Sequence, residues 1–259
     1  MYGTLRHMLS QPYLRHLRTV GQFTVWLVDG EYVRSKINEQ FTNFGQHYRF
    51  PFIPKYEFWI DHLSHPHELH YFIDHLIAEW RAMDAGASYD DAIGRADRIE
   101  RAERHHARIY RELHGRERSH PQEVLRHIHV DRIERYSTRA LSVWIVRSDV
   151  IRDLFYIDFT EGGHAFVYPF VPISEVWIDE DLTPHERPFV VLHELHERNL
   201  MAQHHYDYPR AHRSASAVEE FCRQHPATTQ RKIAAEARIA ARPRSLATPQ
   251  YHWWKTVQS

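Results

Sequence analysis

The stretch Phe189-Val190-Val191-Leu192-His193-Glu194-Leu195-His196-Glu197-Arg198-Asn199-Leu200-Met201 decides how the rest of the chain is interpreted. As a helix, it places His193 and Glu197 one turn apart on one face, with His196 beside them. The same arc carries four apolar residues: Phe189, Val190, Leu200 and Met201. Burying a carboxylate is costly unless a fixed partner or a metal ion compensates it. The function therefore depends on which of these two partners the helix supplies.

Composition narrows the classes of protein. With 259 residues, 42% of them hydrophobic, the chain is long enough for one sizeable core or two smaller ones. The net charge of −1 gives no global sign of a nucleic-acid or acidic-membrane partner. The single cysteine, Cys222, excludes an internal disulfide framework, and no apolar run is long enough to span a membrane. We therefore expect a cytoplasmic protein without a membrane partner.

The chain also repeats itself. A shift of 118 positions aligns residues 25–83 with residues 143–201 without a gap, and about twenty of the fifty-nine positions are identical. The identities include Val25-Trp26 with Val143-Trp144, Phe41-Thr42 with Phe159-Thr160, Trp59-Ile60-Asp61 with Trp177-Ile178-Asp179, and Pro66-His67-Glu68 with Pro184-His185-Glu186. His75 and Glu79 align with His193 and Glu197. When the shift is increased by one residue, Tyr89, Glu100 and Arg104 align with Tyr208, Glu219 and Arg223. These matches indicate a tandem duplication.

Periodicity predicts the elements of each unit, here numbered for the second. Aromatic and β-branched residues predict four strands: 141–146, 155–159, 165–168 and 175–179. Gly162-Gly163 is interpreted as a turn. Thr183-Pro184-His185-Glu186 has the spacing of a capping box, so a helix is expected from there to about Gln203, with either a break or a late start near Pro188. A second helix is expected over residues 209–224.

The resulting prediction is an α+β fold of two homologous units, each a small antiparallel sheet with a helical hairpin, joined by connecting helices. Its parts are an N-terminal segment (1–20) with a short helix, a first repeat (21–104), a helical connector (105–138), a second repeat (139–224) and a C-terminal segment (225–259). The last segment holds a helix over 229–241 and the aromatic cluster Tyr251-His252-Trp253-Trp254. We expect this cluster to dock on the body, on a second copy or on a protein partner.

The helical hairpin carries the candidate metal ligands. A histidine and a glutamate one turn apart suit a single divalent transition metal, zinc first, with iron or manganese as alternatives. His212, at the start of the second helix, is the candidate third ligand, and Glu194 is the candidate general base. Additional candidates are His196, Glu219, His164 and Asp158. The first repeat keeps His75 and Glu79 but has Leu76, Ala78 and Ile93 where the second has Glu194, His196 and His212, so its site is expected to be degenerate.

A second interpretation needs no metal. His193 and Glu197 can bond to each other or to an arginine, as Glu219 with Arg223 can at i,i+4 spacing. The chain has 23 histidines, so some pairs arise by chance. It contains no His-Glu-x-x-His, since the histidines of His193-Glu194-Leu195-His196 are only three apart, and the zincin peptidase motif is therefore absent.

Several motifs together resemble a family of small uncharacterised proteins from bacteriophages and bacteria. They are Val143-Trp144-Ile145-Val146, Arg152, Asp158-Phe159, Gly162-Gly163-His164, Pro172, Glu175-Val176-Trp177-Ile178-Asp179, His193-Glu194-Leu195-His196-Glu197 and Tyr208-Pro209-Arg210-Ala211-His212. The resemblance covers both units and fits the second better. It implies the unit boundaries and a phage or bacterial source, with a location in the virion or the host cytoplasm in the phage case, and no particular reaction.

Two main functional hypotheses follow. The first is a metal-dependent hydrolase with His193, Glu197 and His212 as ligands and Glu194 as base. The second is a non-catalytic structural or interaction protein, such as a virion component, that uses the duplicated fold as a scaffold. Nucleic-acid binding through the arginine-rich connector ranks last, because glutamates are interspersed among its arginines.

Overall fold

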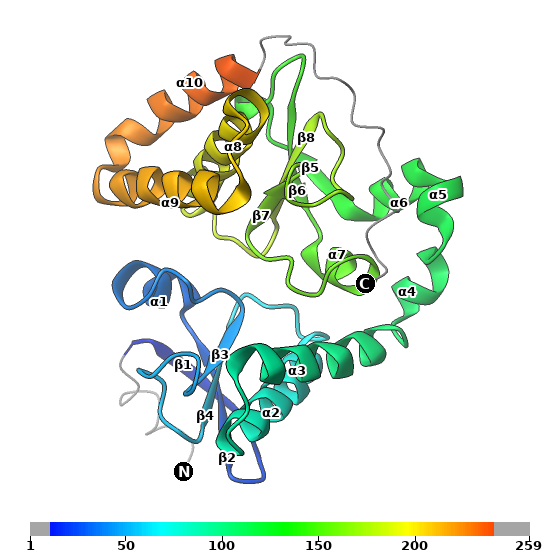
Figure 1. Cartoon of the computed structure of the whole chain (residues 1–259), viewed down its shortest axis with the longest axis vertical. Helices are drawn as coiled ribbons and strands as arrows, with labels where there is room; N and C mark the ends of the chain where they lie inside the picture. The colour runs from blue at the N-terminus through cyan, green and yellow to red at the C-terminus, as the bar shows by residue number, and fades with distance from the viewer. Residues whose placement is uncertain (1–10, 241–259) are drawn as a thin grey trace. The chain divides into compact units, whose positions relative to one another are not determined.

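The computed structural model describes residues 11–240, and the chain divides into two compact units after Arg108. Each unit has its own four-stranded sheet and a helical hairpin (Figure 1). The fold is thus mixed α/β, as expected for an α+β protein. The aromatic cluster at 251–254 lies outside the described residues.

The first unit contains the elements β1 (Tyr13–Val20), β2 (Phe23–Val28), α1 (Gly30–Lys36), β3 (Phe44–Gln46), β4 (Glu57–Asp61), α2 (Leu69–Asp84) and α3 (Tyr89–Arg104). Its sheet has the order β1-β2-β4-β3. A short helix was expected in residues 1–20, but residues 13–20 form β1, an edge strand.

The second unit begins with α4 (Arg108–Leu113), α5 (Arg116–Ser119) and α6 (Pro121–Ile128). It continues with β5 (His129–Arg132), the 3-10 turn η2 (Glu134–Tyr136), β6 (Ser142–Val146), α7 (Ser148–Leu154), β7 (Gly162–His164), β8 (Glu175–Asp179), α8 (Arg187–His204), α9 (Tyr208–Gln224), η3 (Pro226–Thr228) and α10 (Thr229–Ala240). The sheet order is β5-β6-β8-β7, the counterpart of the order in the first unit. The segment predicted as a purely helical connector therefore also supplies an edge strand, β5.

The prediction of purely antiparallel sheets is wrong. The two central strands of each sheet run parallel, β2 beside β4 and β6 beside β8, and only the edge strands are antiparallel to their neighbours. The chain passes from β6 through α7 and β7 before it reaches β8. This path is long enough for the crossover that a parallel pair requires.

Two predicted strands are also wrong. Residues 155–159 follow α7 and run as irregular backbone, in which Phe159 is fully buried in the core whereas Tyr156 is exposed. Residues 165–168 form a turn, whereas Gly162-Gly163, predicted as a turn, lie in β7. The predicted strands at 141–146 and 175–179 and the three C-terminal helices are confirmed.

The second sheet is covered on both faces because its strands alternate. Val176 and Ile178 face α8 in a cluster that includes Val191 and Leu195. Trp177 points the other way, into a cluster formed with α6 and α7. Each face therefore packs against helices, and the α8 face carries the candidate ligands. None of the described helices combines the length and the apolarity that crossing a membrane requires.

A pair of glycines in the first unit offers a test of this packing. A Cβ on Gly45 would lie 2.5 Å from the Phe50 ring, whereas one on Gly94, inside α3, would meet nothing closer than 3.8 Å. We expect Gly45→Ala to destabilise the unit by about 1–3 kcal/mol, because the ring must move. Gly94→Ala should stabilise it by about 0.5–1 kcal/mol through helix propensity. Denaturant unfolding measures both, and equal effects of the two changes would contradict the packing described.

Candidate metal centre

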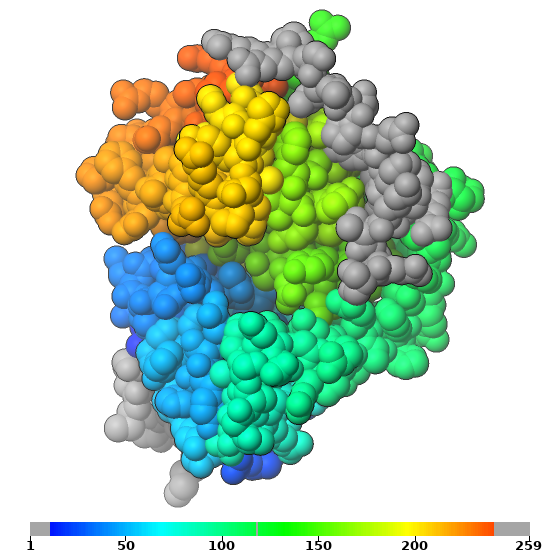
Figure 2. Space-filling view, in the orientation of Figure 1, coloured from blue at the N-terminus to red at the C-terminus, as the bar shows by residue number. Residues whose placement is uncertain are grey.

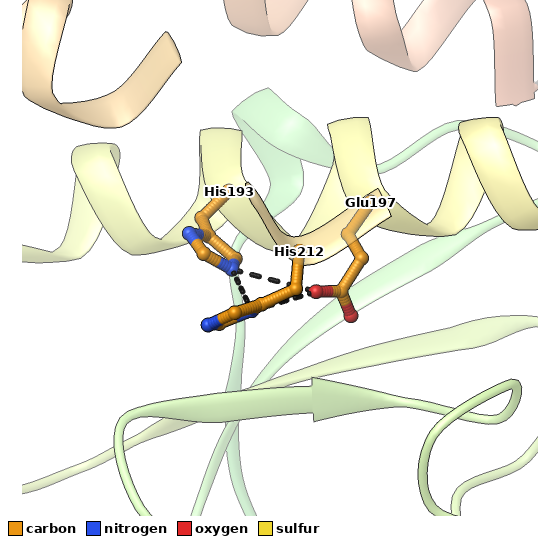
Figure 3. A group of neighbouring side chains, drawn as sticks. All are labelled: His193, Glu197 and His212. Atoms are coloured by element: carbon orange, nitrogen blue, oxygen red, sulfur yellow. Dashed lines mark hydrogen bonds and ion pairs between the residues drawn. The ribbon is translucent and has the colours of Figure 1, made fainter. Parts of the chain in front are cut away.

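Three side chains from α8 and α9 converge at one point in the second unit (Figure 3). His193 Nε2 lies 3.1 Å from His212 Nδ1, and His212 Nδ1 lies 2.9 Å from Glu197 Oε2. The remaining pair, His193 Nε2 and Glu197 Oε2, is 3.6 Å apart. The predicted trio of ligands is therefore brought together.

The separations fit a metal ion. Ligand atoms at about 2.0–2.1 Å from a tetrahedral zinc lie about 3.3 Å from one another, and the three measured separations lie on either side of that value. Two imidazole nitrogens and a carboxylate oxygen also form a donor set that zinc, iron and manganese accept. The His193 and Glu197 side chains are nearly buried, but that of His212 is 45% exposed. His212 is therefore the member of the trio that reaches solvent.

His164 lies next to the trio and holds Glu197. Its Nε2 is 3.0 Å from Glu197 Oε1, and its Nδ1 accepts the backbone N–H of Phe166 at 3.3 Å. A neutral imidazole that accepts at Nδ1 must donate at Nε2, so His164 donates to the carboxylate. Oε1 is thereby engaged, which leaves Oε2 of Glu197 for the shared point. His164 thus positions a ligand in this arrangement.

Glu219 orients His193 from the opposite side of the ring. Its Oε2 accepts from His193 Nδ1 at 2.8 Å, and its Oε1 accepts from Arg223 Nε at 2.9 Å. Because Nδ1 carries that proton, Nε2 is the nitrogen that can offer a lone pair to a metal. A carboxylate that fixes a ligand histidine in this way is a common support of metal sites. Glu219, predicted as a possible ligand, therefore acts on the far side of His193.

Glu194 is a buried carboxyl close to this point. It is 8% exposed, and one of its oxygens lies within 4.8 Å of ligand atoms of both His164 and Glu197. Among residues 11–240 no group forms a hydrogen bond or an ion pair with it. A mostly buried carboxyl close to the Glu197 carboxylate is costly to ionise, and a cation beside it would reduce that cost.

The pKa values of Glu194, Glu197 and His164 are shifted in different directions. Burial raises the pKa of Glu194 to about 8, with a further rise from Glu197. Burial would also raise the pKa of Glu197, but hydrogen bonds from His164, His193 and His212 outweigh it and hold the pKa well below the usual range. Burial lowers the pKa of His164, so this imidazole is neutral.

His193 differs from His164 in its surroundings. Burial would lower its pKa, but its bonds to Glu197 and Glu219 prevail and raise the pKa to about 11. Without a metal, the His193 ring therefore stays protonated between the Glu197 and Glu219 carboxylates. A metal ion at Nε2 would take the place of that proton.

Gly162 allows α8 to approach β7 this closely. A Cβ there would lie 2.9 Å from the Trp177 carbonyl oxygen and 3.1 Å from Glu194 Cγ. Any side chain at this position would thus push the helix away from the strand or displace the carboxyl. The Gly-Gly-His sequence of β7 therefore supplies close approach at Gly162 and a donor at His164.

The first unit keeps the supports of the site and lacks part of its ligand set. His75 Nδ1 bonds to Glu100 at 2.8 Å, and Glu100 accepts from Arg104, as Glu219 does from Arg223. Gln46, which occupies the position of His164, donates to Glu79 Oε1 at 2.7 Å. An amide that replaces His164 in this bond supports its role as a donor.

The first unit differs from the second at two further positions of the site. Ile93 occupies the position of His212, and Phe44 occupies that of Gly162. The Phe44 ring lies 5.1 Å from the His75 ring. An apolar ring thus takes the space that the second unit leaves beside its histidine.

The other sequence candidates lie elsewhere or act indirectly. His196 bonds to Ser214 and Glu236, away from the trio, and Asp158 is exposed in the segment between α7 and β7. Sequence reasoning missed Tyr208, whose ring lies 5.2 Å from that of His212. The duplication gave no signal for it, because the first unit also has a tyrosine, Tyr89, at this position.

Comparisons with known proteins found no relative of this chain. No family model matches the chain, and no curated protein or solved structure is significantly similar to it. The chemistry of the site therefore rests on its own geometry.

Proposed function

We propose that this chain is a metal-dependent hydrolase whose second unit holds one divalent transition metal, zinc in the first place. His193 Nε2, His212 Nδ1 and Glu197 Oε2 are the ligands. The observation that carries the proposal is the convergence of these three atoms, each pair within 3.6 Å. The mostly buried Glu194 lies close to Glu197 beside them. Iron and manganese are the alternatives that the same donor set accepts.

The pattern of three protein ligands with one open side favours catalysis over a structural role. Structural zinc sites are closed by four protein ligands, whereas catalytic sites keep a position for water or substrate. The 45% exposure of the His212 side chain provides that access. When bound, the metal supplies a Lewis acid that makes water easier to deprotonate.

Glu194 is the general base of the proposed reaction. It lies within 4.8 Å of Glu197 and has no competing hydrogen bond among the described residues. Without a metal its pKa of about 8 would keep it largely protonated at neutral pH. A nearby cation lowers the pKa of a carboxyl, so metal binding would convert it into the carboxylate that accepts a proton from water.

The test is metal content. Protein purified without chelator and dialysed against zinc is expected to carry about one ion per chain by elemental mass spectrometry. His212→Asn and His193→Ala should each remove it, because only two ligands would remain. His75→Ala is the matched control, since it changes the aligned histidine of the first unit. The proposal fails if the unchanged protein carries no ion, or if His75→Ala abolishes binding to the same extent.

A further inference from the structure

A second polar cluster joins three helices of the second unit. His196 of α8 places Nε2 3.0 Å from Ser214 Oγ of α9 and Nδ1 2.8 Å from Glu236 Oε1 of α10. Glu236 Oε2 also accepts from Asn199 Nδ2 at 2.8 Å. Helix α8 packs against both α9 and α10, which appear in yellow to orange-red in Figure 2. This cluster shares no residue with the trio of proposed metal ligands.

The direction of the hydrogen bonds makes this cluster chemically specific. An ionised carboxylate only accepts, so His196 Nδ1 donates to Glu236. In a neutral imidazole Nε2 is then the acceptor, and it faces the serine hydroxyl. A serine within hydrogen-bond reach of an imidazole that a carboxylate orients is the signature of an activated nucleophile.

Helix packing alone does not explain the cluster. The first unit builds the same hairpin from α2 and α3 with Ala78 and Arg95 at the positions of His196 and Ser214. The attachment of α10 has other contacts, because Ile233 is 1% exposed in the core and Asn199 bonds the Glu236 carbonyl at 3.0 Å. The hairpin of the first unit thus packs without a counterpart of the Ser214–His196 bond.

We propose that Ser214 is a nucleophile, with His196 as its base and Glu236 as the residue that positions the imidazole, and that it accepts the acyl group of a carboxylic ester. The Ser214 Oγ–carbon bond forms as the ester carbon–oxygen bond breaks. The hydroxyl proton passes to His196 Nε2 and then to the leaving alkoxide. Water subsequently hydrolyses the acyl-serine.

The position of Ser214 also sets the expected rate. Its backbone lies inside α9, where N–H groups are already bonded along the helix, so they cannot stabilise the developing oxyanion. We therefore expect slow acyl transfer, best detected with a reactive probe that traps the serine. A fluorophosphonate suits this purpose, since the Oγ–phosphorus bond forms as fluoride leaves and His196 takes the proton.

The experiment uses the full chain, a tagged fluorophosphonate and peptide mass spectrometry. We expect a label on Ser214, no label in Ser214→Ala, and labelling slowed about 10²–10⁴-fold in His196→Gln. Ser216→Ala is the control, because Ser216 lies on the same helix and its hydroxyl has no hydrogen bond among the described residues. A chelator should leave the labelling unchanged, which separates this site from the metal centre.

Three outcomes would overturn the proposal: no label on the unchanged protein, a label on another residue, or equal labelling of the His196→Gln variant. Glu236→Gln provides a second variant if His196→Gln disturbs α10, and it should slow labelling while circular dichroism stays unchanged. If Ser214 only locks the helices together, Ser214→Ala will lower the melting temperature and the unchanged protein will not react.

Discussion

Phe44→Gly combined with Ile93→His is expected to give the first unit a metal site and to raise the metal content from about one ion per chain to about two. The unit already has His75 and Glu79 at the positions of two ligands, with His75 Nε2 3.5 Å from Glu79 Oε2. Glu100 already fixes the His75 ring through Nδ1. The substitution at position 93 supplies the third ligand from α3, as His212 does from α9.

Phe44→Gly removes the ring that packs beside His75 and restores the glycine of the second unit. Elemental mass spectrometry measures the gain, and Phe44→Gly alone is the control, because it opens the space without adding a ligand. The same pair of changes in a His212→Asn background should carry one ion. Circular dichroism verifies folding, since losing a packed aromatic ring costs about 3–5 kcal/mol. A folded double variant that gains no metal would show that the three-ligand geometry is insufficient.

The sequence predicted the trio because the duplication fixed the register. Aligning His75 and Glu79 with His193 and Glu197 separated the shared residues from those particular to the second unit, above all His212. The helix spacing then placed His193 and Glu197 on one face, and an antiparallel hairpin returned His212 beside them. Each of these steps depends on local periodicity, which is visible in a sequence.

Strand pairing and the roles of the supporting residues were less accessible. A strand of three residues with two glycines, such as β7, has no alternating pattern, and its pairing with β8 comes from tertiary contacts. Without that strand, His164 could not be assigned to Glu197. The distinction between a ligand and a supporting residue at Glu219 required knowing which side of the His193 ring it reaches.

Raising the pH from about 7 to 9.5 is expected to destabilise the first unit through His75. Burial would lower the pKa of this histidine, but its bonds to Glu100 and Glu79 outweigh burial and raise it to about 10. Asp97 Oδ1, 3.9 Å from Nδ1, adds a third acidic group. When the proton leaves, Glu79 and Glu100 lose the positive charge of His75, and Arg104 remains beside Glu100.

The sign follows from proton linkage. The folded unit holds the His75 proton more tightly than the unfolded chain, whose histidine has a pKa of about 6.5. The stabilisation is therefore complete below about pH 6.5 and is lost as pH rises towards the folded value. Between these limits the free energy of unfolding falls by up to about 1.4 kcal/mol per pH unit.

The measurement compares denaturant midpoints of the unchanged protein and of His75→Gln at pH 7 and pH 9.5. Glutamine does not titrate in this range, so the difference between the two proteins isolates His75 from other groups, including His193. We expect the unchanged protein to lose stability on the order of a few kcal/mol relative to the variant. Parallel pH dependence of the two would mean that His75 is neutral in the folded unit, and its bond to Glu100 would then be one between a neutral donor and a carboxylate.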